Sequence, residues 1–497
     1  MADSSDKSSA AVSHLEQMHS HDDPQVRRAA EKRLVRKQDL VITTLLSGCY
    51  FFSYLDRGAI GNARIMGFQD AIGLSDRQYF NCLMSFYVGY MVFEFPALLL
   101  IRRYHAPTIY GLSVIIFGVA GICTAYAKNY AQVIVLRLIL GCGESAVQTS
   151  FLFISLWYRR EELSTRCGYI YCTTPVAGAV AGLIAYAVGK TLGQDSGVSH
   201  LSAWQWLFVI EGIPTVAWGI LVWALLPRFP EHEVESKHSL FFRSEEERAL
   251  ILRRAAAAQH VAHSRFQLFQ MWIAAKDPKV WMMAIGIATH ATALAGFGVF
   301  LPTFFREFGF DRLTTQLYTI IPYSCAFISL LVTSYTSDRL RKRAIPLLGL
   351  TCLAIIGFVI MLATPNAVAG IVGACVISTA VYPAIVLYAA WIPSSNAGYT
   401  KRATATWISQ ICIQVFSIMA TQIYDKPPRF FSGHGTLLGL FVLTFVLILS
   451  TVWLMKRANG KKEDNRVERE SEGNADPDEG KTLEDLCDAH PQYRYVW

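Results

Sequence analysis

The chain alternates between long apolar blocks and short polar connections. Each block has about 20 residues, enough for a helix to cross roughly 30 Å of hydrocarbon. The blocks are apolar on all sides rather than along one stripe, which is typical of helices inside a membrane. Twelve such blocks run over residues 39–60, 79–101, 108–127, 130–157, 166–190, 204–226, 279–305, 314–336, 344–363, 367–392, 401–424 and 434–456. The pattern predicts an all-α polytopic membrane protein with twelve transmembrane helices.

The spacing of the blocks predicts two six-helix bundles joined by a linker. In the linker, Ser244 and Glu247 have capping-box spacing, so we expect a surface helix over "SEEERALILRRAAAA". The tail after Met455 is highly charged, and we expect it to be disordered over much of its length. The predicted segments are an N-terminal tail (1–38), the first bundle (39–226), a linker (227–278), the second bundle (279–456) and a C-terminal tail (457–497).

Composition supports a membrane protein and argues against several other classes. Hydrophobic residues make up 53% of the chain and charged residues only 17%, whereas soluble proteins carry about 25% charge. The polar first 38 residues show no signal peptide, so we expect the first spanning helix to direct insertion. The 11 cysteines have no paired spacing, which argues against a disulfide framework or a zinc site. The net charge of +7 comes from residues beside helix ends, so we expect no nucleic-acid partner.

The short flanks of the blocks predict the orientation, because cytosolic loops carry an excess of Lys and Arg. Positive residues gather in every second flank, and the connection between blocks 9 and 10 has none. Both termini are therefore expected in the cytosol. The positive set includes Arg27, Arg28, Lys32, Arg33, Arg36, Lys37, Arg102, Arg103, Arg159, Arg160, Arg166, Arg339, Arg341, Lys342, Arg343, Lys401, Arg402, Lys456 and Arg457.

Four charged residues are predicted to lie within the membrane. At 1.5 Å per residue, Asp56 and its neighbour Arg57 lie about 25 Å from the inner surface, while Arg137 and Glu144 lie about 10 and 20 Å below the outer one. A charge at such depth costs at least about 2.5–3.5 kcal/mol, so these residues must face water or one another. They could form a structural network that joins helices 1 and 4, or a substrate and proton site, and the two can coexist.

Several sequence motifs occur in the order found in one known family. The chain resembles the major facilitator superfamily, in its anion:cation symporter branch, and the fungal allantoate permease family in particular. The motifs are "FFSYLDRGAIGNARI", "RLILGCGESAVQTSFLFISLWYRREELSTRCG", "WQWLFVIEGIPT" with "LPRFPE", "FLPTFFREFGF", "SDRLRKR", "AGYTKRATATWIS" and "HPQYRYVW". The resemblance implies two six-helix bundles around a central cavity, which work by alternating access.

The resemblance also implies roles for individual residues. Arg57 would bind a substrate carboxylate, for which its planar, permanently charged fork is suited. Asp56 and Glu144 would carry the proton coupling, and Arg137 would tune Glu144 or pair with it. Tyr54 and Tyr90 match positions that line the cavity in related symporters. An arriving anion would compete with the carboxylates for Arg57, which would link substrate and proton.

Two further sites have alternative interpretations. Asp338, Arg339 and Arg343 match a gating loop motif of the superfamily, or are ordinary cytosolic positive-inside charge; the first-half copy "LLLIRRYHAPTIYG" lacks the Asp. His290 in helix 7 could contact substrate, or be an inward-facing histidine without a special role.

We therefore expect a proton-coupled symporter of a small organic anion, such as a vitamin, ureide or organic acid. One alternative is an exporter of a fungal metabolite or drug, although Pro175 and Gly178 match the helix 5 signature of drug antiporters only in part. A second is a nutrient receptor that signals through its charged tails. The sequence shows no metal cluster, nucleophile elbow or phosphate loop, so we expect no enzyme, metal or cofactor. We expect a monomer in the plasma membrane, with protons and lipid as its other partners.

Overall fold

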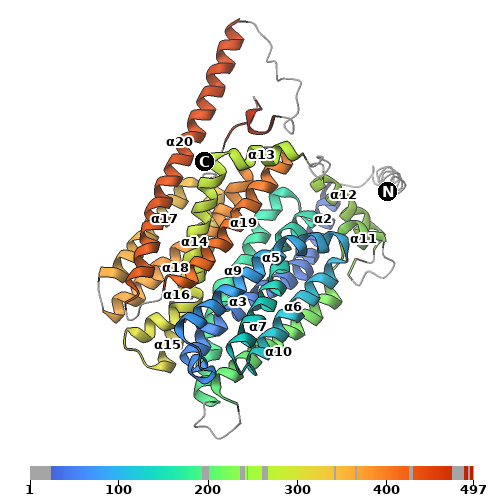
Figure 1. Cartoon of the computed structure of the whole chain (residues 1–497). Coiled ribbons are helices and arrows are strands. Elements are labelled where there is room, and N and C mark those ends of the chain that lie inside the picture. Colours follow the sequence, from blue (N-terminus) through green and yellow to red (C-terminus); the bar gives the residue numbers. More distant parts are fainter. Residues whose placement is uncertain are drawn as a thin grey trace.

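The computed structural model describes residues 24–192, 201–235, 241–242, 244–259, 267–340, 343–363, 366–424, 429–472, 486–490 and 493–495. The described chain is almost entirely helical, and its long helices form two bundles that lie side by side (Figure 1). This is the predicted fold of two six-helix bundles.

The N-terminal bundle contains the first six spanning segments. They are α3 (Thr44–Ile65) with the π-helical turn Asp39–Thr43 before it, α5 (Asp76–Arg103), α6 (Ala106–Thr124), α7 (Tyr130–Gln148) continued by α8 (Ser150–Trp157), α9 (Arg160–Thr191) and α10 (Ala203–Leu225). The C-terminal bundle contains α14 (Pro278–Glu307), α15 (Arg312–Tyr318) continued by α16 (Ile320–Leu340), α17 (Ala344–Ala363), α18 (Ala367–Ser394), α19 (Tyr399–Gln422) and α20 (Phe431–Glu472). Shorter helices outside the spans are α2 (Pro24–Gln38), α4 (Phe68–Ile72), α11 (Pro230–Glu235), α12 (Glu245–Gln259), α13 (Leu268–Lys276) and the 3₁₀ turn Cys487–Ala489.

Local sequence sets where the spanning helices begin. Ser75 accepts a bond from the Gln78 N–H, and the Gln78 side chain accepts one from the Ser75 N–H, which completes a capping box for α5. The side chains of Asn129 and Asp277 cap α7 and α14 in the same sense. These side chains satisfy backbone N–H groups that the first turn of a helix leaves without partners.

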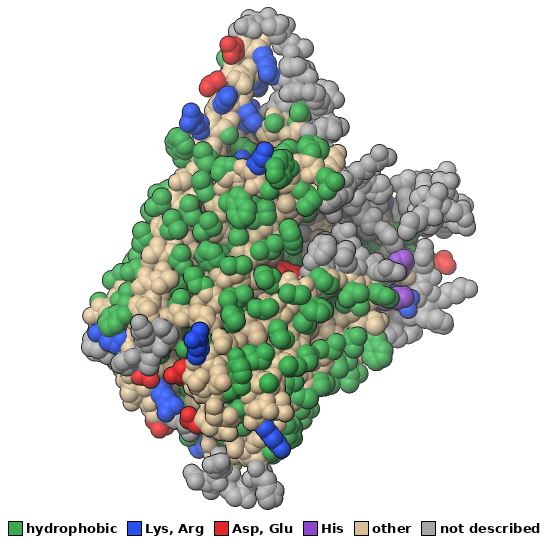
Figure 2. Space-filling model, viewed as in Figure 1, with side chains coloured by type: hydrophobic (Ala, Val, Ile, Leu, Met, Phe, Trp, Pro, Cys, Tyr) green, Lys and Arg blue, Asp and Glu red, His purple; other side chains and the backbone are tan. Residues whose placement is uncertain are grey.

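The outer surface of the bundles is suited to lipid. Ten helical segments of the described chain are long and apolar enough to cross a membrane. The segments α3 and α5 fall outside that set because they carry charged residues and tyrosines, yet they pack within the same bundle. Figure 2 shows hydrophobic side chains over the middle of the molecule and charged ones toward its two ends.

The two ends of the molecule differ. We call the end that carries α2, α12 and α13 the tail end, and the opposite end, where α15 lies, the far end (Figure 1). At the tail end, α12 occupies the stretch where a surface helix was predicted. Ion pairs Lys37–Glu247 and Arg254–Glu162 attach this linker helix to the N-terminal bundle.

Glycines allow the two bundles to approach closely in the far halves of their helices. Gly61 of α3 lies against the backbone of α14, where a Cβ would overlap the carbonyl of Val299. Gly178 of α9 lies against the ring of Tyr323 of α16, one turn from the similar contact of Gly182. The small-residue spacing of α9 thus serves packing between the bundles.

The C-terminal tail is more ordered than the sequence suggested. The prediction of disorder after Met455 is wrong for the described part, because α20 continues to Glu472 and residues 486–490 and 493–495 return to the tail end of the C-terminal bundle. Lys462 explains the return, since its ammonium donates to the backbone carbonyls of Asp488, His490 and Tyr493. Charge composition alone cannot reveal such a distant partner.

Candidate functional site

Arg57 and Glu144 form an ion pair between α3 and α7. The Arg57 Nε donates to Glu144 Oε2 at 2.7 Å, and the Ser53 hydroxyl donates to the same oxygen at 2.6 Å. The Glu144 side chain is completely buried, whereas 22% of the Arg57 side chain is exposed. A buried carboxylate needs such partners, because an unpaired charge there is costly. The helix does not end at this charge: α3 continues for two turns beyond Arg57, to Ile65.

Aromatic rings surround the Arg57 guanidinium. Its Cζ lies 4.7 Å from the ring centre of Tyr54, and 5.2 Å from those of Phe86 and Tyr90. Such cation–π contacts stabilise the charge without satisfying its N–H groups. Neither Nη group of Arg57 donates to a protein acceptor within the described chain, so both can serve a ligand. The structure therefore brings the predicted residues Arg57, Tyr54, Tyr90 and Glu144 together.

Gln148 joins this group one helical turn after Glu144. Its Oε1 accepts bonds from the hydroxyls of Tyr50, at 2.7 Å, and Tyr90, at 3.3 Å. Tyr50 and Tyr54 stack with ring centres 6.3 Å apart. We call the set Tyr50, Tyr54, Arg57, Tyr90 and Gln148 the tyrosine face. Sequence reasoning missed Tyr50, Ser53 and Gln148.

The helical spacing of Tyr50, Ser53 and Gln148 could have identified them from the sequence. Residues 50, 53, 54 and 57 repeat at the interval of one face of α3, and Gln148 follows Glu144 by four positions.

Asp56 belongs to a second, more enclosed cluster with Arg137. Both side chains are buried, and Asp56 points toward α6, where a Cβ on Gly121 would lie 3.2 Å from its Oδ1. The two side chains interact electrostatically, without a hydrogen bond or ion pair between them in the described chain. Arg137 was expected to pair with Glu144 or tune it; the ion pair of Glu144 is made by Arg57, while Arg137 interacts with Glu144 electrostatically. Adjacent residues of a helix point in directions about 100° apart, which separates Asp56 from Arg57.

Glu211 of α10 lies in the same interior of the N-terminal bundle. It is buried, and neither carboxylate oxygen has a hydrogen-bond partner in the described chain. It interacts electrostatically with Asp56. A polar group buried without a hydrogen-bond partner is costly, so Glu211 is a candidate for a functional role.

His290 lies apart from the tyrosine face. It is fully buried inside the C-terminal bundle, its Nδ1 is 2.9 Å from the Gly286 carbonyl oxygen, and its ring packs against Tyr388 and Phe441. This position favours the interpretation of an inward-facing histidine without a special role, because the ring points into its own bundle between α18 and α20.

The predicted gating residues lie at the tail end of the C-terminal bundle. Asp338 and Arg339 belong to the last turn of α16, and their side chains fall outside the described residues. Arg343 follows that turn, and its Nη1 is 3.5 Å from the Ser394 hydroxyl at the end of α18.

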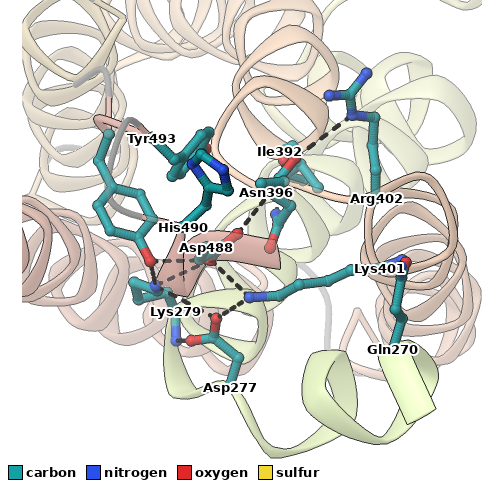
Figure 3. Close-up of polar contacts among 12 residues, drawn as sticks. Gln270, Asp277, Lys279, Ile392, Asn396, Lys401, Arg402, Asp488, His490 and Tyr493 are labelled. Atoms are coloured by element: carbon teal, nitrogen blue, oxygen red, sulfur yellow. Dashed lines mark hydrogen bonds and ion pairs between the residues drawn. The ribbon is translucent and has the colours of Figure 1, made fainter. Parts of the chain in front are cut away.

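A separate polar cluster fixes the C-terminal segment to the tail end of the bundle (Figure 3). The Lys401 ammonium donates to Asp488 at 2.6 Å and to Asp277 at 2.7 Å. Asp488 also accepts from the Tyr495 hydroxyl at 2.9 Å and is 3.3 Å from the Lys279 ammonium. Burial acts to raise the pKa of Asp488, but Lys401 and Lys279 outweigh it and hold the pKa below its ordinary value. We call Asp277, Lys279, Lys401, Asp488 and Tyr495 the C-terminal clasp.

Comparison with known proteins agrees with the geometry. Residues 46–421 match the family model described as Major Facilitator Superfamily. An uncharacterized transporter of Schizosaccharomyces pombe is 30% identical, with 90% of this chain and 93% of that protein covered. The high-affinity nicotinic acid transporter of Saccharomyces cerevisiae is 28% identical, with 94% and 85% covered.

Solved structures show the same fold. The proton:xylose symporter XylE superimposes with a TM-score of 0.65 at 14% identity, covering 84% of this chain and 94% of that one. A bacterial homologue of the lysosomal transporter Spinster gives 0.56 at 15% identity, covering 82% and 94%. With a family match over most of its length and two helical bundles in the corresponding arrangement, the chain belongs to the major facilitator superfamily, a family of membrane transporters.

Proposed function

We propose that the chain is a proton-coupled symporter that takes up a small organic anion with a carboxylate group by alternating access. The observation that carries this proposal is the ion pair of the partly exposed Arg57 with the buried Glu144. The named activity of the yeast relative, transport of nicotinic acid, supports a carboxylate substrate. It also supports placing the chain in the anion:cation symporter branch.

Substrate binding would begin at the free side of Arg57. Its Nη groups present two parallel N–H donors, which suit a carboxylate, while its Nε bonds Glu144. Tyr54 and Tyr90 would hold the guanidinium in place through their ring faces. An anion bound there competes with Glu144 for the same positive charge.

Competition at Arg57 provides a physical link to the proton. When the substrate draws Arg57 away, Glu144 loses its charged partner, and the Glu144 side chain itself has no exposed surface. A buried carboxylate without a partner takes up a proton rather than stay ionised. Asp56, Arg137 and Glu211 are also buried in the same bundle and would complete the path of the proton. Each positive charge that moves inward gains about 2.3 kcal/mol per 100 mV of membrane potential.

The orientation forms part of the proposal. We place the tail end in the cytosol of the plasma membrane, because Lys and Arg dominate its short connections. Cysteine-reactive or antibody probes applied to intact cells should therefore fail to reach tags attached at either terminus.

The test is uptake of radiolabelled nicotinate by the purified full chain in proteoliposomes. An imposed inward proton gradient should drive accumulation, and Arg57→Ala should abolish it, because the carboxylate loses its charged partner. Arg57→Lys keeps the charge but not the fork, so it should retain weak uptake. Accumulation that is indifferent to the gradient and to Arg57→Ala would contradict the mechanism. Movement that requires the opposite gradient would favour export.

A further inference from the structure

We propose that Gln148 determines specificity by donating a hydrogen bond to an acceptor on the substrate, away from the carboxylate that Arg57 binds. The substrate class is then a flat heteroaromatic monocarboxylate whose ring carries a hydrogen-bond acceptor. This inference rests on the proposed function, since it assumes that the tyrosine face binds an organic anion.

The orientation of the Gln148 amide is fixed by two tyrosines from different helices. The hydroxyls of Tyr50 on α3 and Tyr90 on α5 both donate to its Oε1. An amide oxygen has two lone pairs, so these bonds use its acceptor capacity. The Nε2 group carries two donors and has no acceptor in the described chain, and the side chain is only partly buried. The amide thus presents donors to a ligand without further rearrangement.

Gln148 and Arg57 lie at two edges of one aromatic cluster. Tyr90 contacts both: its hydroxyl bonds Gln148, and its ring lies under the Arg57 guanidinium. Tyr50 and Tyr54 link the same two residues from α3, with their rings stacked at an interplanar angle of 19°. A flat ring that stacks on these tyrosines would reach Arg57 with its carboxylate and Gln148 with a ring acceptor.

The position of Gln148 also connects recognition to coupling. It follows Glu144 by one turn of α7, and the helix is interrupted at Thr149 directly after it. A ligand held by Gln148 therefore lies along the helix face that carries the competing carboxylate. A substrate without the ring acceptor would leave the amide donors unpaired, which weakens binding selectively.

The experiment compares two probes that differ in one ring atom. Nicotinate and benzoate share shape and carboxylate, but only nicotinate has a ring nitrogen acceptor. The dissociation constants of both are measured on the purified full chain by isothermal titration calorimetry. The wild-type protein should prefer nicotinate about 5–10-fold, the worth of one hydrogen bond. Gln148→Leu should remove the preference, so that the two dissociation constants become equal within about twofold.

Additional variants distinguish the orientation of the Gln148 amide from its direct contact with the ligand. Tyr50→Phe removes the shorter bond to Oε1, so it should reduce the preference for nicotinate in part. Gln132→Leu, at the exposed start of the same helix, is the matched control and should bind like wild type. Gln148→Glu keeps the size of the side chain but replaces donors by acceptors, and should disfavour nicotinate.

Three outcomes would overturn the inference. Equal binding of both probes by the wild-type protein would show that the protein does not recognise the ring acceptor. A nicotinate preference that persists in the Gln148→Leu variant would show that another residue recognises the ring acceptor. Binding of neither probe, with Arg57 intact, would instead remove the proposed function along with the inference.

Discussion

Glu144 is a buried carboxylate that accepts hydrogen bonds from two donors, Arg57 and Ser53. Its charge can be removed by a substitution that preserves both hydrogen bonds. We predict that Glu144→Gln keeps ligand binding within a few-fold but abolishes accumulation driven by a proton gradient. The reason is that glutamine retains an oxygen for both donors yet carries no exchangeable charge. Binding and gradient-driven uptake are measured on the same preparation.

The matched control is Glu307→Gln, at the exposed far end of α14. It should transport like wild type. Full proton-driven accumulation by the Glu144→Gln variant would exclude Glu144 from the coupling mechanism.

At the scale of elements, the C-terminal clasp joins α14, α19 and the end of the chain. We predict that Asp488→Asn weakens docking of the segment by roughly 2–4 kcal/mol, because Lys401 and Lys279 lose the charge they share. Cys487 is buried beside Asp488 and reports the change. Its labelling by a maleimide, followed by mass spectrometry, should accelerate at least 10-fold.

The exposed Asp464 of α20 supplies the comparison, and Asp464→Asn should leave the labelling rate of Cys487 unchanged. Equal rates in both variants would mean that the clasp contributes nothing to docking.

The clasp also has a defined pH dependence. The pKa of Asp488 is lowered when the segment is docked, so docking is fully stabilised above the ordinary carboxyl value of 3.8. It is lost only as the pH falls through the still lower value of the docked state. Hydrogen exchange of residues 486–490 and 493–495, corrected for the intrinsic rate, should therefore be constant from pH 5 to 8. Release within that range would assign the switch to another group.

For the whole molecule, Gly61 allows α3 of one bundle to lie against the backbone of α14 of the other, and in the proposed mechanism this contact closes the far end. We predict that Gly61→Val lowers the transport rate at least 10-fold, since its side chain would overlap the Val299 carbonyl and separate α3 from α14. Gly298→Val is the control on the facing helix, because a Cβ there meets nothing within 4 Å. Turnover is measured in proteoliposomes, with thermal unfolding as a check on folding.

Reduced ligand binding without loss of turnover in Gly61→Val would place the effect in the site rather than in closure. Equal effects of the two substitutions would contradict a special role for this contact.

The number and order of the helices were predictable from sequence. A block of about 20 apolar residues forms a helix in lipid, because every backbone polar group must be hydrogen-bonded within the segment. The positions of the charged residues within their own helices predicted Arg57 level with Arg137 and Glu144 nearer the middle, but the ion pair of Arg57 is with Glu144. The tail was predicted less well, since the order of Asp488 depends on lysines far away in the chain.

Tertiary structure alone decided which charges pair. Asp56 and Arg57 are neighbours in sequence, but the rotation of α3 turns Arg57 toward Glu144 and Asp56 toward α6. The sequence could not distinguish His290 from a residue that contacts substrate. Packing places it between α18 and α20, inside its own bundle. The sequence determined that this chain is a polytopic helical bundle, because the apolar length of each segment by itself decides whether that segment spans the membrane. The rotation of each helix about its axis determined the candidate site, because partners are chosen by packing between segments.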